Sequence, residues 1–234
     1  MRDRVIVALD VPDTETALEL ARSLKGQVHW LKVGMTLFYA EGPAIVRELR
    51  ALGFKVFVDL KLHDIPHQVR GACRTLVRTG ADMFTVHASG GRAMMEAAAQ
   101  ETAHVAAKFG LAKPAVLAVT VLTSLDDDAL AELGLYGGTE EHALALGRLA
   151  KECGCDGVVC SPEEAVSMRQ TLGDEMLVVT PGVRPAWAEA GDQARTATPE
   201  EAVAAGASHL VIGRPITAAA DPAAAARRII EGDE

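Results

Sequence analysis

The sequence predicts a parallel α/β fold, a (β/α)8 barrel that forms a single domain over residues 1–234. Three observations favour this fold. Eight short apolar runs alternate with segments of helical periodicity, polar residues stand where several runs end, and no linker, composition change or low-complexity tract divides the chain. No glycine-rich dinucleotide fingerprint follows the first run, so a closed barrel is favoured over an open doubly wound sheet.

The apolar runs follow one another along the whole chain and have the length of ordinary strands. We expect strands at Val5–Leu9, His29–Val33, Val56–Leu60, Met83–His87, Ala115–Thr120, Gly157–Cys160, Leu177–Thr180 and His209–Ile212. Polar residues cluster at their carboxyl ends, which is where barrel enzymes carry their active sites. These residues are Asp10, Lys32, Asp59, His87, Thr123 and Arg214.

Helical signals lie between and after the expected strands. One apolar stripe recurs at the spacing of a helix face that packs on a sheet. It consists of Val69, Ala72, Cys73, Leu76 and Val77. The last helix is predicted to begin with Asp221 as its N-cap, followed by Pro222, because the fixed φ of proline suits the first helical position. Two longer connections, Leu125–Gly138 and Gly182–Pro199, have the length of barrel lids.

The composition is that of a globular protein with a large core. The chain is 49% hydrophobic and 24% charged, with a formal net charge of −9. This acidic balance argues against nucleic acid or an anionic membrane as the main partner, although a small anion can still bind at local positive charges. The apolar run after Met1-Arg-Asp-Arg4 is too short for a signal peptide, and no run is long enough to span a membrane, so we expect a cytoplasmic protein.

The four cysteines are predicted to be reduced and mostly buried thiols. They are Cys73, Cys153, Cys155 and Cys160. The Cys153-x-Cys155 pair has no second paired cluster, which a structural zinc site would need.

The block from Asp59 to Pro66, with the sequence DLKLHDIP, carries the strongest chemical signal. Alternation along an extended strand places Asp59 and Lys61 on one face, toward the mouth of the barrel. Taken alone, the spacing D-x-K-x-x-D also fits a run of surface ion pairs. Because such pairs add little stability, charges that follow an apolar barrel strand favour a site. Lys32 would join Asp59, Lys61 and Asp64 in an alternating network.

The loops after the last two strands are where barrels bind phosphate. Gly213 and Arg214 follow the eighth strand, and Arg184 and Gln193 lie after the seventh. A guanidinium group matches phosphate oxygens, although either arginine alone also fits a capped turn. Thr123 and Ser124 supply hydroxyls for a base or ribose, or equally for a turn or helix cap. His87 lacks the partners of a metal site or triad, so a structural histidine is favoured.

Together these residues resemble one family, the bacterial-type orotidylate decarboxylases. The resemblance covers essentially the whole chain. It is carried, in order, by Val7–Asp10, Leu31–Gly34, Asp59–Pro66, Val86–Gly91, Leu122–Ser124, Thr180–Pro185, Gly191–Gln193 and Ile212–Ile216. It implies decarboxylation of orotidine 5′-monophosphate to UMP at the end of pyrimidine synthesis, with no metal and no organic cofactor.

The resemblance also implies a role for each site residue. Lys61 would protonate C6, Asp59 would lie beside the substrate carboxylate, and Lys32 and Asp64 would complete the catalytic network. The substrate contacts would come from Asp10 and Lys32 at the ribose, from Thr123 and Ser124 near the base, and from Arg184, Gln193, Gly213 and Arg214 at the 5′-phosphate. Asp64, Ile65 and Gln68 would reach across the interface of a homodimer, so its active sites would be shared.

One departure and two alternatives accompany the resemblance. The family commonly has Asn-Thr where this chain has His67-Gln68, so we expect an altered ribose contact across the interface. Magnesium-dependent sugar-phosphate decarboxylases or aldolases of the same superfamily share the D-x-K-x-x-D signature but place a glutamate metal ligand at the position of Lys32. A catalytically silent nucleotide-binding protein is the other alternative, and the complete Lys/Asp set argues against it.

Overall fold

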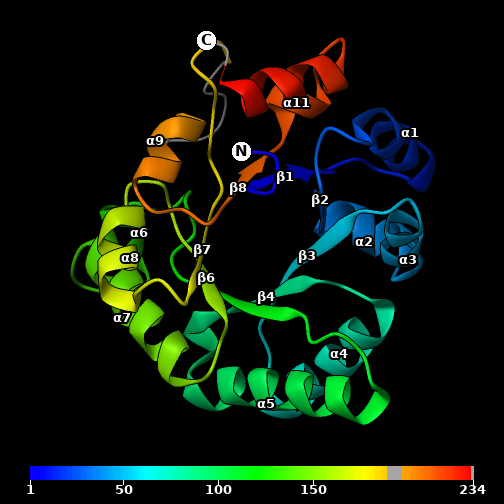
Figure 1. The fold of residues 1–234 in the computed structure, drawn as a ribbon. Coiled ribbons are helices and arrows are strands. Elements are labelled where there is room, and N and C mark those ends of the chain that lie inside the picture. Colours follow the sequence, from blue (N-terminus) through cyan, green and yellow to red (C-terminus); the bar gives the residue numbers. More distant parts are fainter. Residues whose placement is uncertain (189–196, 233–234) are drawn as a thin grey trace.

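The computed structural model describes residues 1–188 and 197–232, and in these ranges eight parallel strands close into a barrel in sequence order (Figure 1). The strands are β1 Val5–Ala8, β2 Trp30–Gly34, β3 Lys55–Leu62, β4 Met83–His87, β5 Ala115–Val119, β6 Gly157–Val159, β7 Leu177–Thr180 and β8 His209–Ile212. Pairing of β1 with both β2 and β8 closes the ring. The predicted (β/α)8 barrel is confirmed.

Helices surround the barrel (Figure 1). They are α1 Thr14–Leu24, α2 Met35–Glu41, α3 Ala44–Ala51, α4 Pro66–Thr79, α5 Arg92–Phe109, α6 Asp127–Glu132, α7 Thr139–Glu152, α8 Ala165–Leu172, α9 Pro199–Ala204, α10 Arg214–Thr217 and α11 Pro222–Glu231, with the short 3-10 helix η1 Ala88–Gly90. The predicted cap of α11 is confirmed, because Asp221 accepts a hydrogen bond from the backbone N–H of Ala224.

The connection after β5, Leu125–Gly138, is long as predicted, and it contains a short helix that the sequence analysis did not predict. This helix, α6, starts where the Asp126 side chain accepts a hydrogen bond from the backbone N–H of Ala129. This is an ordinary N-cap, and the apolar Leu130 of the helix is buried. The helix was missed because its single turn and a half is too short to show a periodic apolar face.

Two layers of apolar side chains form the core. The larger layer lies between the strands and the helices. The smaller fills the barrel with Ile6, Ala8, Trp30, Phe57, Met83, Leu117, Val179 and Val211. Because side chains alternate along a strand, the residues two positions after Ala8, Trp30, Phe57 and Met83 continue the inner face toward the carboxyl ends. They are Asp10, Lys32, Asp59 and Thr85, so the apolar filling gives way there to polar groups.

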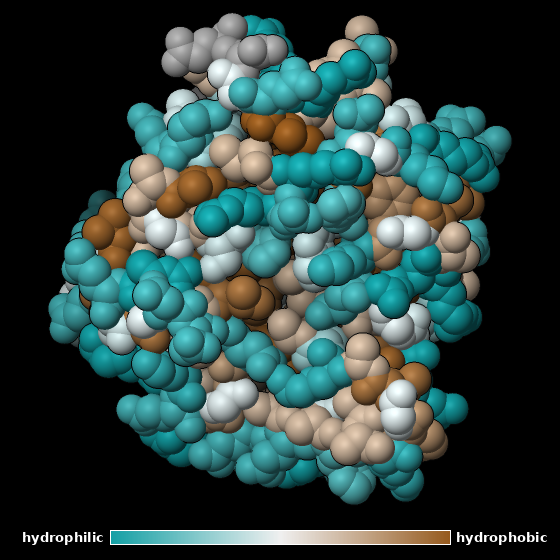
Figure 2. All heavy atoms as spheres, in the orientation of Figure 1, coloured by the Kyte–Doolittle hydropathy of each residue, from teal (hydrophilic) through white to brown (hydrophobic). Residues whose placement is uncertain are grey.

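The surface is mixed in polarity, and the cysteines lie beneath it. Hydrophilic side chains cover most of the face in Figure 2, and hydrophobic ones appear in several separate places, one of them near the middle. No helix within residues 1–188 and 197–232 combines the length and hydrophobicity that crossing a membrane requires. All four cysteines are free and buried, as predicted. Burial raises the pKa of Cys73 to about 11 and that of Cys155 to about 12.

Candidate active site

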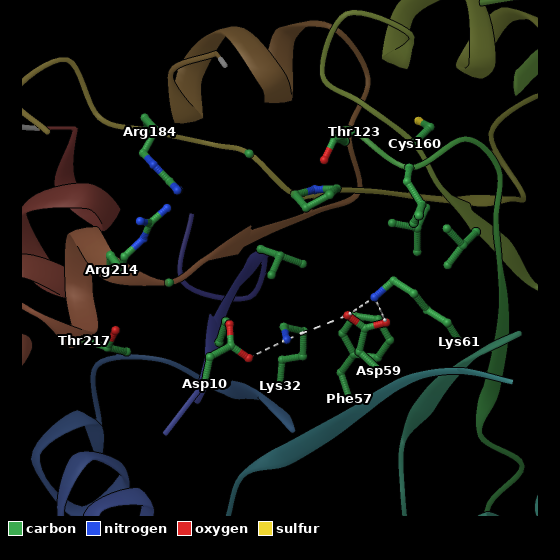
Figure 3. A pocket seen from close by; sticks show the side chains of 18 of the residues that line it. Asp10, Lys32, Phe57, Asp59, Lys61, Thr123, Cys160, Arg184, Arg214 and Thr217 are labelled. Atoms are coloured by element: carbon green, nitrogen blue, oxygen red, sulfur yellow. Dashed lines mark hydrogen bonds and ion pairs between the residues drawn. The ribbon is translucent and has the colours of Figure 1, made fainter. Parts of the chain in front are cut away.

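A cavity of about 410 Å³ opens at the carboxyl ends of the strands (Figure 3). Eight of the predicted site residues line it: Asp10, Lys32, Asp59, Lys61, Thr123, Arg184, Gly213 and Arg214. Gln193 lies outside the described residues. Ser124 lines a neighbouring hollow instead, together with Thr123. The cavity thus gathers side chains from both ends of the sequence at one rim of the barrel.

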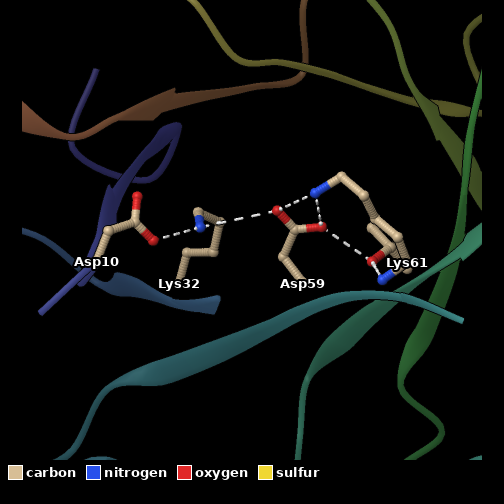
Figure 4. A network of polar contacts seen from close by, with 5 residues as sticks. Asp10, Lys32, Asp59 and Lys61 are labelled. Carbon is tan, nitrogen blue, oxygen red and sulfur yellow. Dashed lines mark hydrogen bonds and ion pairs between the residues drawn. The ribbon is translucent and has the colours of Figure 1, made fainter. Parts of the chain in front are cut away.

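A chain of alternating charges crosses the floor of this cavity (Figure 4). Lys32 Nζ lies 3.0 Å from Asp10 Oδ1 and 3.7 Å from Asp59 Oδ2. Lys61 Nζ lies 3.0 Å from Asp59 Oδ1 and 3.1 Å from Asp59 Oδ2. The side chains of Lys32 and Asp59 are only 9% and 14% exposed. Each buried charge therefore has an opposite charge beside it, which burial of ions requires.

The fourth member of this chain differs from the predicted network. Asp10 and not Asp64 completes it within one subunit. Asp64 is exposed, and its Oδ1 accepts a hydrogen bond from the backbone N–H of Ile65. Asp64, Ile65 and Gln68 do not line the cavity, and Ile65 is 64% exposed. Within one chain, Asp64 therefore stands outside the cavity that Lys61 lines.

The approach of Lys61 to Asp59 depends on an irregular β3. Pairing with β4 is regular up to Val58, and then the register shifts before Leu62. Lys61 has φ +52°, the left-handed region, and no other residue except glycine has a positive φ in the described part of the chain. The predicted proximity of Asp59 and Lys61 is confirmed. Simple alternation along an extended strand is not its cause.

Thr85 of β4 bridges the two residues and was not predicted. Its hydroxyl accepts a hydrogen bond from the backbone N–H of Lys61 (2.8 Å) and donates to Asp59 Oδ1 (2.9 Å). The residue is fully buried. The one signal in the sequence was a hydroxyl among the apolar residues that begin the strand Met83–His87.

Two arginines stand on the opposite side of the cavity, and their guanidinium groups point toward one another (Figure 3). Arg184 follows β7 and donates to the carbonyl oxygen of Val183, and Arg214 is the first residue of α10. Like charges that face each other favour an anion between them. A Cβ at Gly213 would meet only Ala8 Cβ, at 3.7 Å, so packing within the chain does not fill the space beside the arginines. This arrangement is suited to a phosphate group.

The wall between these two polar regions is mostly apolar. Val119, Val121, Leu122 and Val159 line it, with Thr123 at the rim. The cavity therefore combines two charged regions with an apolar wall. No cluster of three or more His, Cys, Asp or Glu side chains within residues 1–188 and 197–232 is arranged to hold a metal ion.

His87 lies beside the site and does not line the cavity. Its ring stacks on His63 with 5.3 Å between ring centroids, and Nδ1 is 2.7 Å from Ser89 Oγ. Burial lowers the pKa of His87, and the neighbouring His63 and Lys61 lower it further. An uncharged, packed imidazole fits the structural role expected from the sequence.

The barrel and its charged cavity define an enzyme of the (β/α)8 class with its site at the carboxyl face. The chain belongs to the orotidine 5′-phosphate decarboxylase / HUMPS family, whose model matches residues 3–229. The orotidine 5′-phosphate decarboxylase of Moorella thermoacetica is 52% identical over 97% of this chain and 91% of that protein. That of Halorhodospira halophila is 54% identical over 97% of this chain and 94% of its own length.

A solved structure supports the same relationship. The crystal structure of orotidine 5′-phosphate decarboxylase from Lactobacillus acidophilus superposes with a TM-score of 0.86 at 41% identity and covers 98% of both chains. The family resemblance predicted from the sequence is confirmed.

Proposed function

We propose that this protein decarboxylates orotidine 5′-monophosphate to UMP in pyrimidine synthesis, without metal or organic cofactor, and that Lys61 protonates C6. Relatives more than 50% identical over nearly the whole chain support the reaction. The observation that carries the mechanism is the Lys61 ammonium held 3.0 Å from Asp59 inside the cavity. The whole chain, residues 1–234, acts in this proposal as one barrel domain.

The chemistry requires an ammonium group beside C6. When the bond from C6 to the carboxyl group breaks, its electron pair stays on C6 and carbon dioxide leaves. The Lys61 ammonium stabilises this developing charge and then transfers a proton to C6, after which the neutral amine regains a proton from solvent. Asp59 holds the ammonium in place and repels the substrate carboxylate. The Lys32 ammonium lies beside the other carboxylate oxygen of Asp59, Oδ2, and offsets its negative charge.

The remaining contacts bind the parts of the substrate that do not react. Arg184, Gly213 and Arg214 hold the 5′-phosphate, Asp10 and Lys32 contact the ribose, and Thr123 lies near the base. Gln193 belongs to the same phosphate grip in this proposal, outside the described residues. Binding energy from the phosphate end contributes to turnover as well as to affinity, because it holds the reacting carbon against Lys61.

A homodimer would complete each site. Asp64, Ile65 and Gln68 are exposed in the single chain, and an isoleucine that is 64% exposed is suited to burial against a second copy. In this dimer Asp64 of one subunit lies beside Lys61 of the other. Gln68 offers an amide to the ribose where the family commonly has a threonine hydroxyl.

The two alternatives are less well supported by the geometry. A magnesium site would need Asp10 and Asp59 as ligands, but the Lys32 ammonium already pairs with both and repels a cation. A silent nucleotide-binding protein would not need the buried Lys/Asp chain.

The test of the proposed function is to supply orotidine 5′-monophosphate and hexulose phosphates to the chelated protein, without and with added Mg²⁺. We expect UMP formation that is independent of magnesium. Turnover of a sugar phosphate only with Mg²⁺ would support the aldolase-like alternative, and binding of UMP without any turnover would support the silent binding protein.

Replacing Arg214 with alanine tests the phosphate grip. We expect kcat/KM for orotidine 5′-monophosphate to fall about 100-fold, because a charge-assisted pair of hydrogen bonds is lost. The same ratio for orotidine, which lacks the phosphate, should change by less than about 3-fold. Arg227, exposed on α11, provides the matched control Arg227→Ala. Equal losses for both substrates would contradict the assignment.

Replacing Gly34 with alanine tests the Asp10–Lys32 pair. Gly34 has φ −90°, which alanine adopts readily, but a Cβ there would lie 2.8 Å from Asp10 Oδ1 and 2.9 Å from Lys32 Nζ. Asp10 and Lys32 must separate, so we expect kcat/KM to fall about 10- to 100-fold. The circular dichroism spectrum should stay unchanged, because the fold is retained. Gly71→Ala is the control, because a Cβ there meets nothing within 4 Å. Normal activity of Gly34→Ala would show that the pair is dispensable.

A further inference from the structure

Thr85 occupies an unusual place in β4. It is a fully buried polar residue in the run Met83–His87, and its side chain lies on the inner face between those of Met83 and His87. A buried hydroxyl is costly unless its hydrogen bonds are satisfied. Both of its bonds go to the catalytic strand β3, one to Lys61 and one to Asp59.

The direction of these two bonds is fixed by chemistry. A backbone N–H can only donate, so the hydroxyl of Thr85 must accept from Lys61. Its single proton is then available for Asp59 Oδ1 alone, at 2.9 Å. The same oxygen also receives Lys61 Nζ at 3.0 Å. Two donors therefore converge on Oδ1, and the carboxylate of Asp59 is held in one orientation.

The hydrogen bond from the Lys61 N–H to Thr85 supports an unfavourable backbone conformation of Lys61. Lys61 has φ +52°, a left-handed conformation that is unfavourable for a residue with a Cβ. The regular ladder between β3 and β4 is interrupted from Val58 to Leu62, and the hydroxyl of Thr85 receives the N–H of Lys61 within this gap. Thr85 thus fixes the backbone of Lys61, from which the lysine side chain starts. It also fixes the Asp59 carboxylate, which pairs with the ammonium group at the end of that side chain.

We propose that Thr85 is a positioning residue of the reaction, which sets the Lys61 ammonium by holding the Lys61 backbone and the Asp59 carboxylate together. The proposal rests on the proposed function, because it assigns Thr85 to the same decarboxylation. Thr85 does not line the cavity, so it acts through its two partners and not on the substrate.

The test is Thr85→Val, which keeps the shape of the side chain and removes both hydrogen bonds. We expect kcat to fall about 10- to 100-fold, the effect of losing one hydrogen bond to a charged group. KM and the Kd of UMP should stay within about 3-fold, because the arginines at the phosphate end are untouched. Thr85→Ser restores the hydroxyl and should recover most of kcat.

Thr102→Val is the matched control. Thr102 is equally buried, and its hydroxyl donates to the carbonyl oxygen of Ala98 within α5. This variant loses a buried hydroxyl without touching β3, so its kcat should remain near the wild-type value. The proposal is overturned if Thr85→Val is no slower than Thr102→Val, or if Thr85→Ser is as slow as Thr85→Val. Thr85→Ala replaces Thr85→Val in these comparisons if the valine variant does not fold.

A readout independent of activity separates this proposal from the proposed function. Hydrogen exchange of the Lys61 amide should be at least about 10-fold faster in Thr85→Val than in the wild type, since the hydrogen bond from this amide to the Thr85 hydroxyl is lost. Unchanged exchange overturns the role of Thr85 whatever the protein catalyses. Failure of the wild-type protein to decarboxylate orotidine 5′-monophosphate instead overturns the proposed function. The exchange measurement then still tests whether Thr85 binds the Lys61 amide.

Discussion

Replacement of Lys61 with alanine is expected to lower turnover of orotidine 5′-monophosphate by more than about 10⁴-fold while UMP still binds, because general acid catalysis and stabilisation of the developing charge are lost together. The Lys61 ammonium lies on the floor of the cavity, whereas the arginines that would hold the phosphate stand on the opposite side (Figure 3). In Lys61→Ala, the rate of decarboxylation should therefore fall while the affinity for UMP is kept. Single-turnover rates and calorimetry with UMP measure the two quantities.

Lys113→Ala is the control for Lys61→Ala. Lys113 also pairs with an aspartate, with its Nζ 2.6 Å from Asp156 Oδ1, but it does not line the cavity. Its removal should leave kcat unchanged. Turnover by Lys61→Ala close to that of Lys113→Ala would remove Lys61 from the mechanism.

Mixing two inactive variants is expected to restore activity if the sites are shared between subunits. In a homodimer of Lys61→Ala, or of Asp64→Ala, both active sites lack one required residue and are inactive. In a mixed dimer, one site carries both defects, and the other combines an intact Lys61 from one chain with an intact Asp64 from its partner. After joint unfolding and refolding, about a quarter of all sites should be intact, because random pairing makes about half of the dimers mixed.

A mixture of Lys61→Ala with Asp59→Ala is the matched control for this complementation. Lys61 and Asp59 form an ion pair within one chain, so every site of a mixed dimer lacks one of them. This mixture should stay inactive. If mixed dimers of Lys61→Ala and Asp64→Ala are demonstrated and remain as inactive as the control mixture, the shared site is wrong.

The barrel and the position of its cavity could be predicted from the sequence because both depend on local patterns. Short apolar runs specify strands, and a charge after such a run, as at Asp59, marks the carboxyl end of the barrel. Parallel pairing in sequence order then brings Asp10, Lys32 and Asp59 to one rim without further information.

The geometry of Lys61 could not be predicted in the same way. Positive φ is expected at glycine or asparagine, and lysine gives no such signal. The cause lies on another strand, where the hydroxyl of Thr85 binds the Lys61 amide. Contacts of this kind depend on the register between β3 and β4, which the local sequence does not encode. The ion pair between Asp10 and Lys32, which the predicted network did not include, depends on a side-chain contact between the ends of β1 and β2.

The most direct measurement is turnover of orotidine 5′-monophosphate in D₂O by the wild-type protein after dialysis against a chelator, followed by NMR of the nucleotide product. We predict one UMP for each substrate consumed, deuterium at C6 from the exchanged ammonium of Lys61, and a rate unchanged by added Mg²⁺. A chelated protein that forms no UMP, or that forms it only after a metal ion is restored, would contradict the metal-free decarboxylation by Lys61.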